Sequence, residues 1–574
     1  MLRLGHVACA AGFVAAVTAT TSAGVWYVDA TAGAGGDGVS WEAPFDGLEE
    51  ALAVAQPGDE VWVRAGVYVP STTDSTVSFV LAPGVSVYGG FNGTETARNQ
   101  RDWQVNVTTL SGDIGQDDQY APVYQRMGSN SGHVLVGSNV DATAELDGFV
   151  IGYGAIGPPG TFSNDPLMHG SGLYCFGGAP TVRNCTFRYN QAAFLAGGAI
   201  LLYDTDATIE NCRFEYNSVH INSGGGIYSG GASSLTLTDC VFVGNNCTSA
   251  TPDALGGGLY HQGTGPITIS RCTFDSNRVT PFYNNSPAYG GGVAVFTGQT
   301  TVTDTTFINN KAGYGGGMIL WSPGSLTNCL FIGNEAIETP SKPVDNGGFG
   351  GGFMSYSFAS HVMTLNNCTF VKNRAQKYSA IYGGWNSTSD VNNCVLWGNI
   401  ALNPDVAPYW KGEISGNFNL SHSCVLHIFD PSGPGEDPPN PNGLPGCIDV
   451  DPQFVDFAGG DYRLTETSPC IDTGITSAVP MGVTTDLDGN ARVVDALGGG
   501  SIVDMGCYEF AAAPQACPGD ADGSSQVDLG DLNIVLFNFG ASVTPGSSGD
   551  VDGSGTVDLG DLNIVLFNFG ATCA

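Results

Sequence analysis

A short phrase recurs through the middle of this 574-residue chain: Asn-Cys-Thr-Phe, with a further Asn five residues after the cysteine. The anchor cysteines are Cys185, Cys212, Cys240, Cys272, Cys329, Cys368, Cys394 and a weaker Cys424, and Thr305 replaces the cysteine in one copy. The later asparagines are Asn190, Asn217, Asn245, Asn277, Asn310, Asn334, Asn373 and Asn399. A glycine cluster such as Gly224 to Gly226 separates most copies. A self-similar period of roughly thirty residues indicates a repeat architecture.

The spacing and alternation of the phrase select one kind of repeat. Cys and Phe alternate with Thr, which predicts strands with an apolar inner face, and no helical periodicity separates the copies. The spacing varies from 24 residues (Thr305 to Cys329) to 39 (Cys329 to Cys368), which disfavours propeller blades of fixed size. Coils of parallel strands tolerate such variation because extra residues leave as loops. The sequence therefore predicts an all-β fold, a right-handed parallel β-helix solenoid.

Each part of the phrase has a physical role in such a coil. We expect the Cys and Phe side chains to stack on their copies in neighbouring coils, with most anchor cysteines as buried thiols. The repeated Asn would sit at a turn, where stacked amides hydrogen-bond one another. The glycines would supply special backbone angles or close approach. Residues 145–430 resemble the right-handed β-helix repeats of the pectate-lyase-like superfamily, including its asparagine ladders.

The net charge and the N-terminal segment limit the possible binding partners and the cellular location. The net charge is −36 with only 18 basic residues, which argues against nucleic acid or anionic membranes as partners. It also disfavours tight binding of anionic polysaccharides. Residues 1–23 have the pattern of a secretory signal peptide, with a basic start, an apolar stretch and a small-residue cleavage site. No other stretch is apolar enough to span a bilayer, so we expect a secreted or cell-surface protein.

The rest of the chain divides into modules. Residues 24–140 are expected to form an N-terminal capping part, with a helix over 46–55 that begins in a capping box of Asp46 and Glu49. Residues 141–430 carry the β-helix repeats, and 431–510 form a closing segment. A linker at 511–516 leads to a small module at 517–574, bracketed by Cys517 and Cys573, which are candidates for a disulfide.

The C-terminal module carries the strongest chemical motif. Its first loop places oxygen-bearing residues at positions 1, 3, 5, 7, 9 and 12 of an EF-hand-type loop, and a second loop repeats the pattern thirty residues later. The two sets are Asp520, Asp522, Ser524, Gln526, Asp528 and Asp531, then Asp550, Asp552, Ser554, Thr556, Asp558 and Asp561. We expect two calcium ions, one in each loop, whose binding drives folding of the module.

The helix after each calcium loop carries two apolar faces, and one of them is enough to pack helix against helix. Leu532, Val535, Leu536 and Phe539 form one stripe, while Ile534 and Phe537 point elsewhere, and the second copy is identical. The leftover face either meets a partner or packs on the rest of the chain. The duplicated loop and helix resemble type I dockerin modules. That resemblance implies a protein receptor of the cohesin type, and other receptors remain open.

Aromatic residues follow the glycine clusters at even offsets and are expected to face outward. Stacked coil on coil, they would form one vertical stripe able to receive sugar rings, or would only cover one another. The candidates are Tyr203, Tyr228, Tyr260, Phe296, Trp321 and Tyr356.

Evidence for a catalytic centre is weaker. Asp204 and Asp206 could form a carboxylate pair but are more typical of a turn, and His261 is more typical of a buried structural histidine. We therefore expect an exported protein that binds or processes extracellular polysaccharide and carries a calcium-dependent docking module. If it is an enzyme, it would be a polysaccharide lyase or an O-glycosyl hydrolase. The alternative is a non-catalytic structural or adhesive protein of the cell surface.

Overall fold

The computed structural model describes residues 23–119, 126–155, 170–192, 196–220, 223–249, 254–281, 287–337, 348–357, 360–384, 386–402, 413–428, 444–494, 500–510, 518–524 and 526–571. Residues 1–22 of the predicted signal peptide (1–23) and both cysteines of the candidate disulfide, Cys517 and Cys573, lie outside these ranges. Within them, no helix is long and apolar enough to cross a membrane. Contacts divide the chain into two compact units, 1–450 and 451–574.

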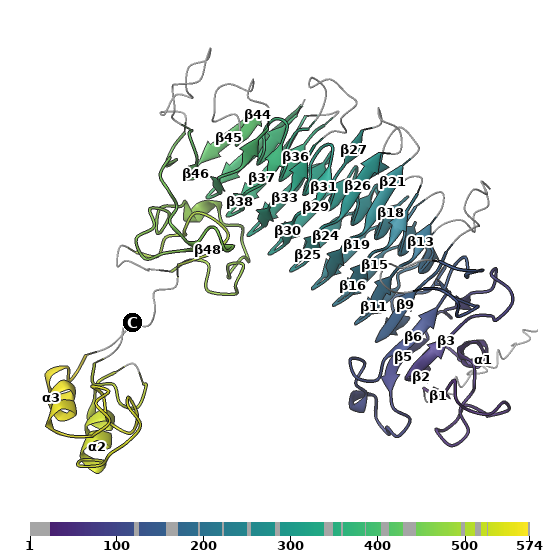
Figure 1. Ribbon diagram of the computed structural model, residues 1–574, viewed down its shortest axis with the longest axis horizontal. Coiled ribbons are helices and arrows are strands. Elements are labelled where there is room, and N and C mark those ends of the chain that lie inside the picture. The colour runs from purple at the N-terminus through teal and green to yellow at the C-terminus, as the bar shows by residue number, and fades with distance from the viewer. Residues whose placement is uncertain are drawn as a thin grey trace, which may run out of the picture. The chain divides into compact units, whose positions relative to one another are not determined.

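The first unit is a parallel β-helix, and each full coil contributes one strand to each of four sheets (Figure 1). The first sheet has thirteen strands: β1 Val25–Val28, β2 Glu60–Arg64, β5 Ser86–Phe91, β8 Glu145–Asp147, β11 Thr181–Arg183, β15 Ala207–Glu210, β19 Leu235–Thr238, β24 Ile267–Ser270, β29 Thr300–Thr303, β33 Gly324–Thr327, β37 His361–Asn366, β41 Ser387–Asn392 and β45 Phe418–Ser421. The second sheet has eleven: β4 Phe79–Val80, β7 Leu135–Val136, β10 Leu173–Phe176, β14 Ile200–Tyr203, β18 Ile227–Gly230, β23 Leu259–His261, β28 Val293–Val295, β32 Met318–Leu320, β36 Phe353–Ser355, β40 Ile381–Gly383 and β44 Ile414–Gly416.

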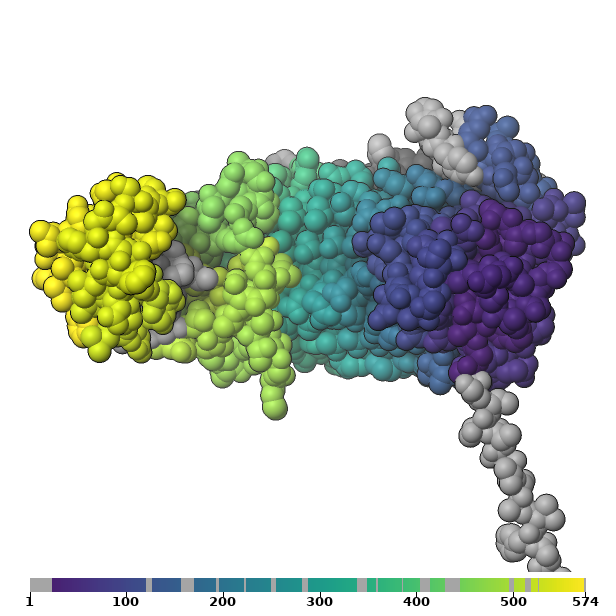
Figure 2. All heavy atoms as spheres, turned by 90° about the horizontal axis from the view of Figure 1, so that it is seen from below, coloured from purple at the N-terminus to yellow at the C-terminus, as the bar shows by residue number. Residues whose placement is uncertain are grey.

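The third sheet carries the phenylalanines of the phrase and has twelve strands: β3 Gly66–Tyr68, β6 Thr108–Ser111, β9 Phe149–Gly152, β12 Thr186–Arg188, β16 Arg213–Glu215, β20 Val241–Val243, β25 Thr273–Asp275, β30 Thr306–Ile308, β34 Leu330–Ile332, β38 Thr369–Val371, β42 Val395–Trp397 and β46 Cys424–Val425. The fourth has eight short strands: β13 Gln191–Ala192, β17 Ser218–Val219, β21 Asn246–Ser249, β26 Arg278–Pro281, β31 Lys311–Ala312, β35 Glu335–Ala336, β39 Arg374–Ala375 and β43 Ile400–Ala401. Strands β22 Ala254–Leu255 and β27 Ala288–Tyr289 pair beside them. Figure 2 shows the coils following one another in sequence order from blue to green.

The register places like residues over like residues, as the repeat predicts. Phe214 pairs with Phe242, which in turn pairs with Phe274, and these rings stack with centroids 4.4 and 4.5 Å apart. The anchor cysteines are buried free thiols, also as predicted. Seven of them, Cys185 to Cys394, lie between the strands of the first and third sheets rather than inside a strand. Cys424 does not take the anchor position, because it begins β46 and pairs with Val395. The buried interior therefore comes from stacking between coils, which no single coil could supply.

Two corners in each coil explain the rest of the phrase. The residue before the anchor cysteine has a left-handed backbone, as Asn211 does with φ +49°, and so does the residue before the ladder asparagine, as Tyr216 does with φ +52°. Asparagine and glycine adopt this conformation at low cost, which accounts for their recurrence at turns. The glycine clusters combine both predicted roles. Gly256 has φ +67°, and a Cβ on Gly257 would lie 2.3 Å from the carbonyl oxygen of Gly291 in the next coil.

The predicted asparagine ladder is confirmed. Each ladder amide donates to the Oδ1 atom of the next, as Asn277 Nδ2 does to Asn310 Oδ1 at 3.0 Å. The last asparagine, Asn399, donates instead to a glutamate that closes the ladder, with its Nδ2 2.6 Å from Glu413 Oε2. Burial raises the pKa of Glu413 to about 8. The repeat pattern does not predict this glutamate, because it lies 14 residues after Asn399 and not at the repeat spacing.

The N-terminal helix differs from the prediction at its start. Helix α1 spans Leu48–Val54, and its N-cap is Gly47, with no side chain bonded to the cap. The expected capping box of Asp46 and Glu49 is therefore wrong. The predicted apolar face is correct, since Leu48, Leu52 and Ala55 are buried. A short 3₁₀ turn, η1 Arg98–Gln100, follows later in this part.

The second unit contains an antiparallel pair, β47 Phe454–Asp456 and β48 Asp461–Leu464, a 3₁₀ turn η5 Thr476–Ala478, and two helices. The helices are α2 Leu529–Phe537 and α3 Leu559–Phe567, identical in sequence. Their module has a small core of Val527, Val535, Val557 and Val565, with Leu532 and Leu562 partly buried against it.

Candidate functional site

The outward residues of the second sheet do not form the single stripe that the sequence suggested. The odd positions face inward as expected, since Ile227, Leu259 and Val293 belong to the main core. The even positions divide into two rows. Tyr228 and Tyr260 share one row with Leu201 and Ala294, whereas Tyr203, Phe296, Trp321 and Tyr356 occupy a row at or just beyond the strand ends.

The first row is mostly covered. Tyr260 is 4% exposed and Tyr228 is nearly as buried, and both pack with Leu255, Tyr289 and other apolar side chains in a second cluster outside the coil. Burial raises the pKa of Tyr228 to about 12. Of the two alternatives, ring faces open to sugars or rings covered by neighbours, the second holds for these two tyrosines, because a further ladder of residues lies over them.

That further ladder is the part of the site that sequence reasoning missed. Tyr289, Tyr314 and Phe349 each stand just before the first glycine of a cluster, and consecutive members pair by isolated β-bridges. The signal was present in the sequence as an aromatic residue before glycine in three consecutive repeats. Strand alternation after each glycine cluster does not predict it, because these aromatic residues precede the clusters.

Ring contacts join these residues into one continuous surface, which we call the aromatic shelf. Its members are Tyr289, Phe296, Tyr314, Trp321, Phe349, Tyr378 and Tyr382. Centroid separations run from 4.9 Å (Phe349–Tyr382) to 5.9 Å (Tyr314–Phe349). Phe296 is exposed and the other members are half-buried, so each ring is held by packing while part of it reaches solvent.

The shelf spans four successive coils. With about 4.8 Å between parallel strands, three intervals extend it roughly 14 Å along the coil axis. Among the residues that the structure describes, one cation lies over a ring of the shelf. It is Lys377, whose Nζ atom is 5.7 Å from the centre of the Phe349 ring. Tyr203 is separate: it stacks on Phe176, with centroids 5.6 Å apart, several coils away. Tyr356 packs in the same apolar cluster as the shelf.

The residues weighed for catalysis have structural partners. Asp204 Oδ1 accepts a hydrogen bond from the Ala232 amide at 2.7 Å, and Asp206 Oδ1 accepts one from the Ser234 amide at 3.0 Å. Each aspartate thus holds the turn of the next coil. His261 is fully buried, with Nδ1 3.0 Å from Ser229 Oγ, and burial lowers its pKa to about 4.

The two calcium-loop candidates bring together three carboxylates each. Oxygen atoms of Asp520, Asp522 and Asp531 lie within 4.8 Å of one another, and those of Asp550, Asp552 and Asp561 do the same. These are loop positions 1, 3 and 12. The hydrogen bond from Ser524 holds the pKa of Asp522 below its ordinary value. Clustered hard oxygens fit calcium.

The remaining loop positions have other contacts. The position-9 carboxylates of Asp528 and Asp558 cap the following helices, accepting from the Gly530 and Gly560 amides at 2.6 Å. The position-5 hydroxyl of Ser524 lies 3.1 Å from the position-7 carbonyl oxygen of Gln526, and Ser554 lies equally close to that of Thr556.

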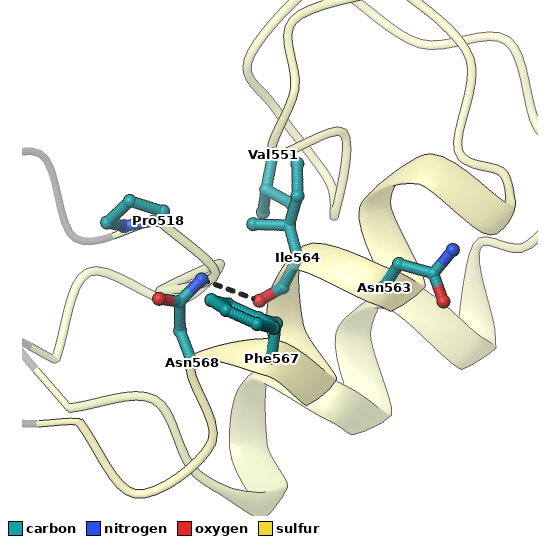
Figure 3. A pocket seen from close by; sticks show the side chains of 6 residues that line it. All are labelled: Pro518, Val551, Asn563, Ile564, Phe567 and Asn568. Carbon is teal, nitrogen blue, oxygen red and sulfur yellow. Dashed lines mark hydrogen bonds between the residues drawn. The ribbon is translucent and has the colours of Figure 1, made fainter.

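Apolar side chains remain uncovered on both helices of this module. Phe537 and Phe567 are each 91% exposed. Leu536 and Phe539, expected in the packed stripe, are about half exposed, as are Leu566 and Phe569, so that assignment is wrong. The buried stripe is narrower: Val535 and Val565 are the apolar helix residues that are buried, and Val527 and Val557 complete the core. A pocket of about 370 Å³ lies beside α3, lined by Pro518, Val551, Asn563, Ile564, Phe567 and Asn568 (Figure 3).

Comparisons with known proteins agree with the fold. Residues 171–350 match the family described as right handed beta helix region. None of the curated proteins matches the sequence.

Similar solved structures include the pectate lyase Pel9A (11% identity, 86% of this chain and 97% of that one, TM-score 0.38) and a rhamnogalacturonan lyase (14%, 64% and 87%, TM-score 0.34). A pectin methylesterase from Erwinia chrysanthemi is a third (12%, 59% and 90%, TM-score 0.26). Likenesses this distant assign no activity. The repeat region is a right-handed parallel β-helix.

Proposed function

We propose that this protein is exported, that its β-helix binds extracellular polysaccharide on the aromatic shelf, and that its C-terminal module binds two calcium ions and docks on a protein receptor. The observation that carries the binding proposal is the continuous row of seven contacting aromatic rings, each held by packing and each open to solvent on part of its surface. A monomeric protein seldom leaves such a surface exposed without use.

The chemistry of the shelf favours sugar rings. Pyranose faces present CH groups, which pack on the π surfaces of aromatic rings, and a pre-set ring loses little entropy when it binds. A shelf of roughly 14 Å accommodates several sugar units side by side. The net charge of −36 works against polyuronates, because a single lysine beside the shelf does not offset it. We therefore propose a neutral polysaccharide as the ligand.

Binding is favoured over cleavage. Glycoside hydrolysis requires two carboxyl groups on either side of the scissile bond, and the one pair weighed for that role, Asp204 and Asp206, holds backbone amides of the next coil. The proposal therefore places the protein among binding or adhesive proteins of the cell exterior. Detection of a lyase or hydrolase activity would show instead that the protein is an enzyme.

A glycan panel separates these outcomes. Neutral and uronate polysaccharides are tested by affinity electrophoresis with the full mature chain, and each mixture is assayed for new reducing or unsaturated ends, with calcium and with EGTA. Retardation by a neutral glycan without new ends is the expected result. Release of ends would replace the binding proposal with catalysis, and no retardation by any glycan would refute polysaccharide as the partner.

The docking proposal rests on the two helices. Phe537 and Phe567 occupy equivalent places on identical helices, so the module presents two copies of one apolar surface. Large exposed aromatic residues are typical anchors of protein interfaces. We propose a receptor of the cohesin type. Immobilised cohesin should retain the full chain in calcium and release it in EGTA. If cohesin does not retain the chain even in calcium, receptors of this class are excluded.

A further inference from the structure

A third cluster of carboxylates lies far along the sequence from the calcium loops, in the N-terminal part of the β-helix. Oxygen atoms of Asp113, Asp117 and Asp118 approach within 4.8 Å of one another. The three residues follow strand β6, and Asp113 forms an antiparallel bridge with Asn130. No sequence motif predicted this cluster, because its fourth member is twelve residues away.

Burial separates this cluster from ordinary surface acids. Asp113 is 1% exposed and Asp118 is 7% exposed, while Asp117 reaches solvent. Like charges gathered at low solvent exposure repel strongly unless a cation neutralises them. The Asp113 oxygens accept from the amides of Asp117 and Asp118 at 3.2 Å each, which is long for bonds to a carboxylate.

Asn130 supplies an independent indication of a ligand. Its side chain is 6% exposed, and its Nδ2 donates to Asp118 Oδ2 at 2.9 Å and to the Tyr153 carbonyl oxygen at 2.7 Å. Its Oδ1 is buried and has no hydrogen-bond partner in the described part of the chain. Because Oδ1 and Nδ2 share one carbon, this oxygen lies within about 5 Å of the Asp118 carboxylate. A buried amide oxygen left without a donor costs about 1–3 kcal/mol unless something binds it.

We infer that Asp113, Asp117, Asp118 and Asn130 form a cation site, and that its ligand is a hard divalent ion, calcium. Three carboxylates and one amide oxygen match the oxygen ligands that calcium prefers, and waters complete its six to eight positions. The bound ion would tie the residues that follow β6 to Asn130. It would also neutralise the two buried aspartates and satisfy Asn130 Oδ1.

Terbium, which occupies calcium sites, distinguishes this site from the calcium loops by luminescence. Emission excited through tyrosine requires a tyrosine or tryptophan close to the ion, and residues 517–574 contain neither. Tyr153 lies beside the proposed site, where burial raises its pKa and the Asp118 charge adds to the shift. Tyrosine-sensitised emission is therefore expected from the N-terminal site, and variants of the tail loops test that the tail does not contribute.

The experiment titrates EGTA-treated full-length mature protein with terbium under tyrosine excitation. We expect saturable emission that calcium displaces, that Asp520→Asn with Asp550→Asn leaves unchanged, and that Asp113→Asn abolishes. Since Asp113 is buried and its variant can fail to fold, exposed Asp117→Asn is the second test, with at least a fivefold loss of affinity expected. Absence of sensitised emission from the wild type, or equal affinity in the Asp117 variant, would overturn the site.

Discussion

Replacing Asn277 by alanine tests the ladder that holds the coils together. Asn277 is fully buried; its Oδ1 accepts from the Asn245 backbone amide at 3.0 Å, and its Nδ2 donates to the Phe242 carbonyl at 2.9 Å. The neighbouring ladder amides each retain one hydrogen bond in the variant. Asn245 Nδ2 still donates to the Phe214 carbonyl, and Asn310 Oδ1 still accepts from the backbone amide of residue 277. Two backbone groups therefore lose their partners, and at about 1–3 kcal/mol each the expected destabilisation is about 4 kcal/mol.

Local hydrogen exchange is the suitable assay, because a repeat protein need not unfold in one step. A loss of about 4 kcal/mol raises local opening roughly a thousandfold, so amides of β20, β21 and β25 should exchange faster by about that factor. Thr268→Ala, on the exposed face of β24 in the same coil, is the matched control and should change exchange less than about threefold. Equal protection from hydrogen exchange in the two variants would refute the stabilisation assigned to the ladder amides.

Two other predictions concern charge and metal. The folded pKa of Glu413, about 8, lies above its ordinary 4.5, so its stabilising effect is complete below pH 4.5 and is lost as pH rises through 8. Asp504 and Glu509 also have raised pKa values, so thermal unfolding from pH 5 to 9 is compared between the wild type and Glu413→Gln. The loss should be about 4 kcal/mol larger in the wild type, and an equal loss in both proteins would contradict the assignment. In the tail, Asp561→Asn should remove one of two calcium ions in titration calorimetry, whereas Asn563→Ala, outside the loop, should bind both. Two retained ions in the Asp561 variant would exclude it as a ligand.

The sequence predicted the β-helix because stacking between coils repeats the same chemistry at every copy. The phenylalanine stack and the amide ladder follow from Phe274 and Asn277 recurring in register. The closing Glu413 could not be predicted in this way, since it occurs once. It takes the place of a ladder asparagine in space, by accepting from Asn399, although it is a different residue at a different spacing.

The candidate sites were predictable to different extents. Six oxygen positions of each calcium loop follow a fixed spacing, yet Asp528 caps a helix, because a carboxylate before a helix satisfies its free amides. The outward direction of Tyr260 followed from strand alternation. Its burial did not, because the residues that cover it, Tyr289 among them, belong to a different corner of the coil.

The most direct test of the proposed function measures the affinity of a neutral oligosaccharide, taken from the glycan that binds in the panel, for three forms of the full chain. Trp321→Ala combined with Phe349→Ala removes two central rings of the shelf, worth about 2 kcal/mol together. Tyr203→Ala removes a ring that is 38% exposed on the same sheet but outside the shelf. We predict about 30-fold weaker binding for the double variant and unchanged binding for the control. Equal affinity in all three proteins would contradict the aromatic shelf as the binding surface.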